Sequence, residues 1–293
     1  MELRRIRAGW LGLVAGMVCV TCGASRVRAS GDEGPGMCQD YRGDRDAAVT
    51  LRTSLFRHRS AESQVAAADL PLDELPADVR GSVQLVVSKP TLFTRAPAEV
   101  FTCCPSIYQW LLANPDQAVV VWRRLGAKCM DIQNRGKGVF GWADGQGSDV
   151  RWWTVHHSPQ MRIWYAEGNA RAAGILPLVP VRAVVVLRHT EGKNSAGRPI
   201  VRHQIDMFLQ TDSKTAALVA RLMGPSGPRM AEQSAGQMAM FFSALAWYLD
   251  QHPTKAQAIL QGILPAEAPE WRELKQRAQA PRSPGTVPPS PEQ

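Results

Sequence analysis

The spacing of apolar positions changes at Gly126, from a helical period of about 3.6 residues to the period of two that is typical of strands. Before this glycine the pattern predicts a strand and then two short helices, over residues 83–93, 97–112 and 115–125. Asn114 and Pro115 have the residue types preferred at an N-cap and at the first helical position. Gly126 suits a left-handed C-cap, so the second short helix is expected to end there.

Alternation of apolar and polar residues predicts six strands after Gly126. They are expected over residues 127–134, 137–143, 149–157, 160–167, 182–190 and 199–210. Turn-forming residues separate most of them, and residues 168–181 are predicted to form a longer loop. Short turns between successive strands favour antiparallel hairpins over strand–helix–strand units.

The chain returns to a helical period after the last strand. A helix that begins at Asp212 or Ser213 is expected to reach Met223, and a long helix is expected from Met230 to Gln251. Large apolar residues recur on one face of the long helix at spacings of three and four: Met238, Phe241, Phe242, Leu245 and Leu249. Such a stripe needs a partner surface, and the predicted sheet is the largest one.

Two short segments carry a resemblance to a known family. The segment RAPAEVF, Arg95 to Phe101, is similar to the end of the first strand and the start of the first helix in the START-like helix-grip (SRPBCC) superfamily. The segment NPDQAVVVWRRLG, Asn114 to Gly126, resembles the second short helix of that superfamily. The order of elements agrees as well, over about residues 82–252.

The resemblance implies a fold and a kind of ligand. In the superfamily the sheet wraps around the last helix and encloses an apolar cavity that binds lipids, sterols, polyketides or other apolar molecules. We therefore expect an α+β fold in which a curved antiparallel sheet grips a long C-terminal helix. The superfamily has no universal catalytic set, so the resemblance implies no catalytic residue.

The N-terminus has the pattern of an export signal. A start with three arginines precedes a charge-free apolar run over residues 8–24, and Val27 and Ala29 would allow cleavage before Ser30. We expect export to the periplasm or the extracellular space. A retained membrane anchor is the alternative, since about 17 apolar residues approach the length of a spanning helix. In that case the protein would stay close to the membrane.

Composition divides the chain into four parts. They are a signal peptide over residues 1–29, a partly disordered N-terminal extension over 30–80, a helix-grip-like domain over 81–264, and a helix end with a proline-rich disordered tail over 265–293. The formal net charge is +8, but the leader holds five arginines and one glutamate, so half of this charge leaves with it. The remaining arginines are scattered along the chain, and a nucleic-acid partner is not expected.

The cysteines suggest at most one or two disulfides. Beyond the leader the chain keeps Cys38, Cys103, Cys104 and Cys129, which allow three pairings in an oxidising compartment. A bridge from Cys103 or Cys104 to Cys129 is predicted, because neighbouring cysteines rarely bond to each other. The alternative is a set of buried thiols that pack as small hydrophobic residues. Beyond the leader no C-x-x-C pair is present, so neither a structural zinc site nor another metal or cofactor is expected.

Aromatic residues and histidines gather in residues 149–168, which raises the question of a catalytic or metal site. His156 and His157 are expected on opposite faces of a regular strand, where they could not hold one metal ion together. His203 lies on an apolar stripe, either as a hydrogen-bonded core residue or as a polar contact inside a pocket. The residues expected to line a ligand cavity, or else an ordinary core, are His203, Ile205, Met207, Trp153, Tyr165, Met238, Phe241 and Leu245.

These observations predict an exported binding protein that holds a lipid or another apolar small molecule between the sheet and the C-terminal helix. One alternative is a non-enzymatic cell-envelope domain that mediates protein contacts without a cavity. Another is an enzyme that acts on an apolar ligand in the cavity, with His203 or His157 as acid or base. The letters G-x-G-x-x-G occur at residues 136–141, but a strand and not a helix is predicted there, so they do not form a dinucleotide fingerprint. No phosphate-binding loop or hydrolase elbow motif occurs in the sequence, and no catalytic residue or protein partner is assigned.

Overall fold

The computed structural model describes residues 61–171, 178–211, 227–265 and 267–279. Its strands are β1 (Leu92–Arg95), β2 (Glu99–Thr102), β3 (Gln133–Asn134), β4 (Val139–Ala143), β5 (Asp149–His157), β6 (Met161–Arg171), β7 (Leu178–Lys193) and β8 (Pro199–Thr211). Its helices are α3 (Ala77–Ser88), α4 (Pro105–Ala113), α5 (Pro115–Arg124), α7 (Gly227–Gln251), α8 (Pro253–Leu260) and α9 (Pro269–Gln279), with a 3-10 turn at Leu72–Glu74. Residues 61–68 are helical as well.

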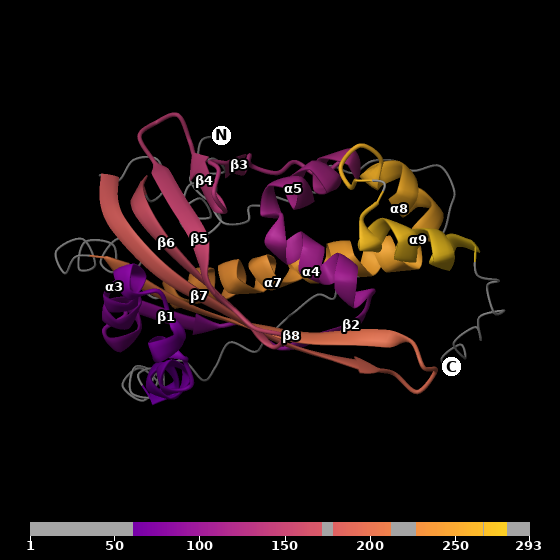
Figure 1. Cartoon of the computed structure of the whole chain (residues 1–293). Helices are drawn as coiled ribbons and strands as arrows, with labels where there is room; N and C mark the ends of the chain where they lie inside the picture. The colour runs from indigo at the N-terminus through magenta and orange to yellow at the C-terminus, as the bar shows by residue number, and fades with distance from the viewer. Residues whose placement is uncertain (1–60, 172–177, 212–226, 266, 280–293) are drawn as a thin grey trace, which may run out of the picture.

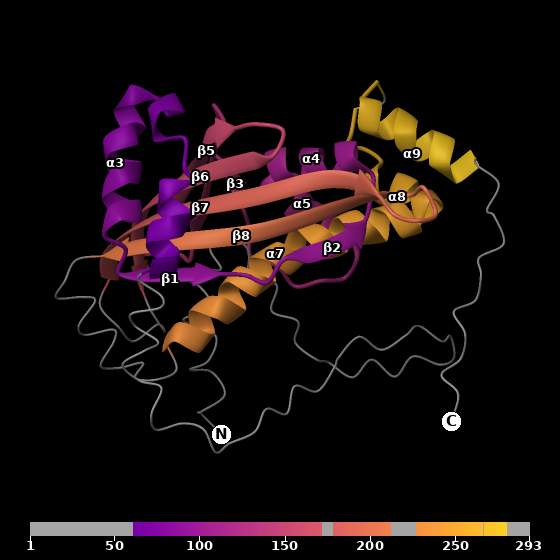
Figure 2. The same ribbon diagram turned by 90° about the horizontal axis from the view of Figure 1, so that it is seen from below.

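The strands form one curved antiparallel sheet. Seven strands follow the order β1-β8-β7-β6-β5-β4-β3, and β2 pairs with β8 beyond the end of β1. Helix α7 crosses the concave face of this sheet beside α4 and α5, whereas α3 lies against the opposite face (Figures 1 and 2). The predicted fold class, a curved antiparallel sheet that grips a long C-terminal helix, is confirmed.

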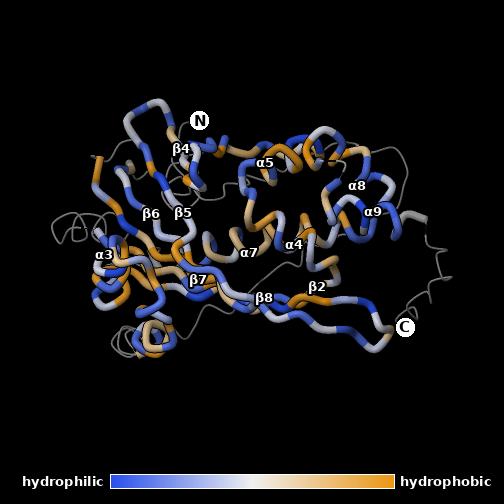
Figure 3. The backbone as a smooth tube through the Cα atoms, viewed as in Figure 1, coloured by the Kyte–Doolittle hydropathy of each residue, from blue (hydrophilic) through white to orange (hydrophobic). Residues whose placement is uncertain are grey.

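Both faces of the sheet are buried, and two apolar clusters result. Along β7, Val185 and Leu187 belong to an inner cluster between the sheet and helices α4, α5 and α7. Val184 and Val186, which point the other way, belong to an outer cluster with α3 and residues 66–75. All four side chains are fully buried, as expected for a strand with packed layers on both sides. Apolar residues accordingly recur along both β7 and α7 (Figure 3).

A buried ion cluster helps to fix the N-terminal segment to the outer face. Asp206 is fully buried and forms ion pairs with Arg95 and Arg188. Arg188 also donates from Nη2 to the carbonyl oxygen of Ala66 at 3.2 Å. The expected boundary after residue 80 therefore falls inside α3, in a segment that packs on the sheet. The part of the predicted extension before residue 61 lies outside the described residues.

Three local predictions before the sheet's central strands need correction. Residues 83–88, predicted as strand, are helical because the buried Val79, Val83 and Val86 follow a helical spacing. The helix predicted over 97–112 is instead β2 followed by α4, since residues 99–102 pair with β8 and Pro105 starts α4 at its first position. The strand predicted over 127–134 is reduced to β3, at Gln133–Asn134.

The other helices and strands agree more closely with the pattern. Helices α5 and α7 occur where they were predicted, and Gly126 has a φ of 86°, as a left-handed C-cap requires. The predicted loop over 168–181 is shorter, because β6 continues to Arg171 and β7 begins at Leu178. The helix predicted from Asp212 to Met223 lies outside the described residues.

Candidate functional site

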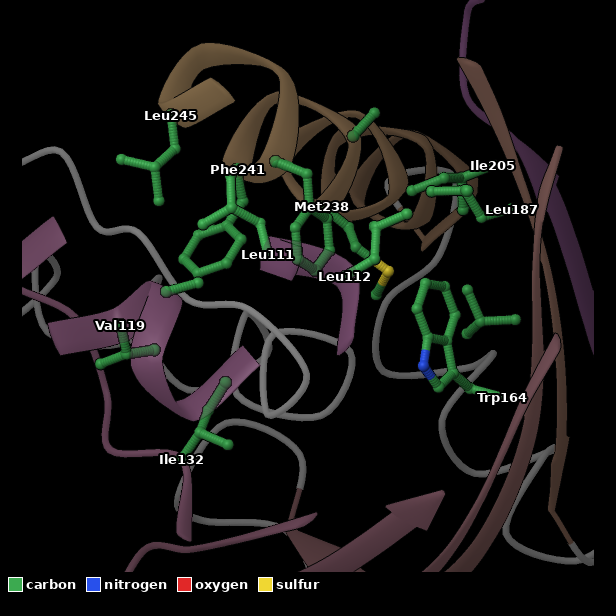
Figure 4. Close-up of a cluster of buried hydrophobic side chains, with 14 of the residues drawn as sticks. Leu111, Leu112, Val119, Ile132, Trp164, Leu187, Ile205, Met238, Phe241 and Leu245 are labelled. Atoms are coloured by element: carbon green, nitrogen blue, oxygen red, sulfur yellow. The ribbon is translucent and has the colours of Figure 1, made fainter. Parts of the chain in front are cut away.

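Side chains of the inner cluster occupy the space between α7 and the sheet. Met238, Phe241 and Leu245 point from α7 toward Leu111 and Leu112 of α4 (Figure 4). Residues of the sheet complete the cluster from the other side, among them Trp164, Leu187, Ile205 and Met207. Phe242 of α7 stacks on Trp164, with 6.4 Å between ring centroids.

A row of hydrogen-bonded polar residues lies beside this cluster. The pairing of β2 with β8 sets Glu99 opposite His203, and His203 Nε2 lies 3.3 Å from Glu99 Oε2. The other ring nitrogen, Nδ1, is 2.7 Å from the hydroxyl of Tyr108 on α4. Ser243 of α7 donates its hydroxyl to Glu99 Oε2 at 2.5 Å. The row therefore connects α7, the edge of the sheet and α4.

Burial and hydrogen bonds shift the pKa values of Glu99 and Tyr108 in this row. Burial alone would raise the pKa of Glu99, but hydrogen bonds from His203 and Ser243 outweigh it and lower the pKa. Burial raises the pKa of Tyr108 well above its usual value, so its hydroxyl stays protonated at neutral pH. The Tyr108 hydroxyl can then donate to Nδ1 of His203, and Nε2 of His203 can donate to Glu99, which satisfies all three groups.

A second polar group lies next to this row. His189 on β7 is the direct neighbour of His203 in the sheet, and its Nε2 lies 2.6 Å from Nε2 of Gln109 on α4. Burial, with a smaller effect from the positive charge of Arg162, lowers the pKa of His189 to about 4. The neutral imidazole therefore accepts at Nε2 from the Gln109 amide and carries its proton on Nδ1.

Three buried polar atoms of this group have no hydrogen-bond partner among the described residues. They are Nδ1 of His189, Oε1 of Gln109 and Nε of Arg162. Arg162 is only 6 % exposed, and its Nη1 donates to the carbonyl oxygen of Leu112 at 3.0 Å, at the C-terminal end of α4. Buried polar atoms are usually paired, because each unpaired one costs about 1–3 kcal/mol. Two of the three residues, Gln109 and Arg162, also line a cleft.

This cleft, called here the α4 cleft, has a volume of about 900 Å³. Its walls come from α4, from the β5–β6 turn, from the end of β7 and from α9: Gln109, Trp110, Ala113, Asn114, His157, Ser158, Pro159, Gln160, Arg162, Thr190, Glu191 and Glu270. Arg162 and Ala113 also line a second cleft of about 440 Å³, called here the β4 cleft. Arg162 thus belongs to the wall of two neighbouring clefts.

A third cleft, of about 710 Å³, lies near the other ends of β6 and β7 and includes Arg182 and Thr211. Four of its five charged residues pair with one another, Arg135 with Asp149 and Arg151 with Glu167, whereas Arg182 forms no ion pair among the described residues. The paired charges make it a less specific site than the α4 cleft.

The structure brings together six of the eight predicted ligand residues. His203, Ile205, Met207, Met238, Phe241 and Leu245 are all on the inner face and almost completely buried. Trp153 and Tyr165 contact each other, with 5.2 Å between ring centroids, and pack with the outer cluster on the opposite face. They are separated from the other six by the sheet itself. Of the eight residues, only Trp153 lines one of the three clefts described above, the β4 cleft.

The two histidines of β5, His156 and His157, lie on opposite faces of the sheet as expected, but a bulge precedes them. The register with β6 shifts between Thr154 and His156. Each histidine therefore lies on the face opposite to the one that regular alternation along β5 would give it. His156 Nδ1 lies 3.6 Å from Glu74 on the outer side, whereas His157 lines the α4 cleft. Burial, with help from the charge of Arg162, lowers the pKa of His157. In the described part of the chain, no group of three or more His, Cys, Asp or Glu residues is arranged to hold a metal ion.

The predicted disulfide between Cys129 and Cys103 or Cys104 is not formed in the structure. Cys103 and Cys104 are buried at the start of α4, where Sγ of Cys104 lies 3.0 Å from Oγ of Ser106. Cys129 is only partly buried, beyond the end of α5. Cys38 lies outside the described residues.

Sequence reasoning missed Glu99, Tyr108, Gln109, His189 and Arg162. The sequence did contain one signal, because Arg162 shares a strand face with the apolar Trp164 and Ala166. Glu99, Tyr108 and Gln109 gave none, since the segment that holds them was predicted to be helical, with a break at Pro105. Their roles depend on the pairing of β2 with β8, about a hundred residues later in the chain.

No protein-family model matches the chain, and no curated protein matches its sequence. Solved structures similar to it include a conserved protein from Geobacillus kaustophilus, 11% identical, which covers 54% of this chain and 97% of its own with a TM-score of 0.37. A hypothetical protein from Helicobacter pylori is 11% identical over 56% of this chain and 93% of its own, with a TM-score of 0.36.

Truncated norcoclaurine synthase from Thalictrum flavum is also similar, at 11% identity over 51% of this chain and 92% of its own, with a TM-score of 0.29. These scores are low, and the helix-grip-like description of this chain rests on its own sheet and helices. Membership of the START-like superfamily stays a prediction.

Proposed function

We propose that the chain is an exported small-molecule-binding protein whose ligand occupies the α4 cleft, on the concave side of the helix-grip sheet. One observation carries the proposal. A cleft of about 900 Å³ at the edge of the inner apolar cluster is lined by Gln109 and Arg162, and each of these residues has a buried polar atom without a partner among the described residues. Binding sites for small molecules have this size and this mixture of apolar walls and a few placed polar groups.

The position of the ligand differs from the cavity expected beneath the centre of α7. Phe241, Met238 and Leu245 are buried against α4 and the sheet, so side chains of the protein itself occupy that place. The α4 cleft is on the same face and is open to solvent at the β5–β6 turn. Trp110 and Ala113 offer apolar surface, and Gln109 and Arg162 are polar residues of the wall. A ligand with an apolar body and a polar end fits these walls better than a purely apolar lipid.

The row of Glu99, His203 and Tyr108 supports the site rather than reacting in it. Each of the three groups is hydrogen-bonded within the row, and Tyr108 and His203 are at most 1 % exposed. None of the three lines the α4 cleft. A general acid or base must reach its substrate within hydrogen-bond distance, so binding is favoured over the enzymatic alternative.

A protein-contact function is a second candidate, and one observation favours it. Met240 and Trp247 are 51 % and 44 % exposed and lie seven residues apart on α7, on the same side of the helix. Export is part of the proposal through the pattern of residues 1–29, which lie outside the described residues. Within the described residues, no helix is long and apolar enough to cross a membrane.

The proposal is tested by identifying the small molecule that the purified protein retains. Ala113 is an exposed residue of α4 in the cleft wall, and Ala113→Trp would fill the cleft with an indole ring. Ala258→Trp adds the same ring at an exposed position of α8 and serves as the matched control. Wild-type protein and both variants are purified without denaturation, and organic extracts are compared by mass spectrometry.

We expect one small molecule at near-stoichiometric amount in the wild type and in Ala258→Trp, and at most a tenth of it in Ala113→Trp. An extract without any such molecule, or equal amounts in all three proteins, would contradict the proposal. Capture of a protein by the wild type and its loss in Trp247→Ala would favour the protein-contact function instead.

A further inference from the structure

Arg162 is a buried arginine without an acidic partner. It is 6 % exposed, and no carboxylate of the described residues forms an ion pair with it. Burial lowers its pKa, and Tyr108 is the one group that acts in the opposite direction. An arginine nevertheless keeps its charge in proteins, so a full positive charge lies in the wall of the α4 cleft. Buried charges are normally paired or bound to a ligand.

The hydrogen bonds of Arg162 leave part of its guanidinium available. Nη1 donates to the carbonyl oxygen of Leu112, which places the side chain across the end of α4. Nε is buried and has no hydrogen-bond partner among the described residues. The hydrogen bond to the end of α4 therefore satisfies one N–H group of Arg162, whereas the Nε–H group has no acceptor among the described residues.

The charges around Arg162 do not compensate it. In the α4 cleft, Glu191 and Glu270 lie in the same wall, but neither approaches Arg162 within the 4.0 Å of an ion pair. His157 is the direct neighbour of Arg162 across the β5–β6 pair, and its pKa is lowered partly by the positive charge of that arginine.

In the β4 cleft, the other charged residues are Lys137 and Arg151, both cationic. Arg151 is already paired with Glu167 at 2.5 Å, so Lys137 adds to the positive charge near Arg162. The two clefts thus meet at a buried cation that no acidic group neutralises.

We infer that the ligand carries an anionic group, a carboxylate, sulfonate, sulfate or phosphate, that accepts hydrogen bonds from Arg162 while its apolar part lies against Trp110 and Ala113. The inference rests on the proposed binding function and adds the chemical class of the ligand. An arginine is suited to this role, because its planar donors match the oxygens of such anions.

A matched pair of fluorescent probes tests the inference. 1-Anilinonaphthalene-8-sulfonate and N-phenyl-1-naphthylamine share the same ring system, and only the first carries a sulfonate. After retained ligand has been removed from each protein, the affinities of the two probes are measured for the wild type, for Arg162→Gln and Arg162→Lys, and for Arg182→Gln. Arg182 is an exposed arginine of β7, eight residues from Thr190 and so about 26 Å along the strand. It lines the third cleft, so its variant also reports an anion bound there.

We expect the sulfonate to bind the wild type and Arg182→Gln at least tenfold more tightly than the neutral probe. Arg162→Gln should weaken sulfonate binding about tenfold to hundredfold, the range of a charge-assisted hydrogen bond, and change neutral-probe binding less than twofold. Arg162→Lys should recover part of the loss. If Arg162 had a purely structural role, its substitution would weaken the binding of both probes to a similar extent.

A measurement on the wild type covers the case in which Arg162→Gln does not fold. The Nε–H signal of Arg162 in a ¹H–¹⁵N spectrum, identified by its loss in Arg162→Lys, should shift on addition of the sulfonate and not of the neutral probe. Equal affinity of the two probes for the wild type, or loss of sulfonate binding in Arg182→Gln alone, would overturn the anion site while the binding function stands. Binding of neither probe to the wild type would overturn both.

Discussion

Acid should destabilise this protein through His189, between about pH 6.5 and pH 4. Burial lowers the pKa of His189 in the folded state to about 4, against about 6.5 in the unfolded chain. Over this interval the unfolded chain binds more protons than the folded protein, so the free energy of unfolding rises with pH. The contribution of His189 to the free energy of unfolding is thus fully present above pH 6.5 and is lost as the pH falls toward 4.

The size of the effect follows from the two pKa values. At pH 5 the unfolded imidazole is almost fully protonated and the folded one is mostly neutral, which corresponds to about 2 kcal/mol. The limit at still lower pH is about 3.4 kcal/mol, or 2.5 pKa units. Glu99 contributes little in this interval, since its lowered pKa matters only as carboxylates become protonated.

Urea unfolding followed by circular dichroism at about pH 7.5 and pH 5 measures this effect. The wild type should lose about 2 kcal/mol more between the two pH values than His189→Gln, which keeps a polar group and cannot titrate. Gln109→Met disturbs the same contact but keeps the imidazole, so it should lose as much as the wild type. An equal loss in the wild type and His189→Gln would refute the neutral, buried state assigned to His189.

Three substitutions test other contacts by the same urea assay at neutral pH. Tyr108→Phe removes the hydroxyl from His203 and should cost about 1–3 kcal/mol, because Nδ1 is then buried without a partner; no change would contradict the hydrogen-bonded row. Asp206→Asn should cost about 2–4 kcal/mol, since the two arginines that pair with it are only partly exposed; a loss below about 1 kcal/mol, as for a surface ion pair, would contradict a buried and paired carboxylate. Gly168→Ala should cost more than about 2 kcal/mol, because its Cβ would lie 2.1 Å from the carbonyl oxygen of Asp149; a neutral result would refute that close approach of β5 and β6.

The sequence pattern was most informative where burial repeats along an element. Alternation in residues 149–157 and 199–210 predicted β5 and β8 closely, and the apolar stripe of residues 230–251 predicted α7 and its contact with the sheet. A strand or helix that is covered by a packed layer keeps its period over many residues, and a period can be read without knowledge of the partner.

The pattern failed where partners distant in sequence decide the structure. The apolar residues 83–88 suit either period, and their helical state follows from packing on the outer face of the sheet. The bulge between Thr154 and His156 reversed the directions of the following histidines, although the sequence shows no sign of it. Trp153 and Tyr165 were assigned to the inner face because both faces of these strands are apolar, and only the observed layers separate them.

The candidate site was predictable to a smaller extent than the fold. His203 was identified as a polar residue on an apolar face, and its partners Glu99 and Tyr108 came from segments whose pairing is not encoded locally. Arg162 became recognisable only when its burial, its cap on α4 and the two clefts could be seen together.

The most direct test of ligand binding in the α4 cleft is titration of Ala113→Trp and Ala258→Trp with both naphthalene probes. The indole at position 113 occupies the cleft and leaves Arg162 unchanged, whereas the indole at position 258 lies on α8. We predict that Ala113→Trp binds both probes at least tenfold more weakly than the wild type, and that Ala258→Trp binds them as the wild type does. Unchanged affinity of Ala113→Trp for both probes would contradict a ligand site in this cleft.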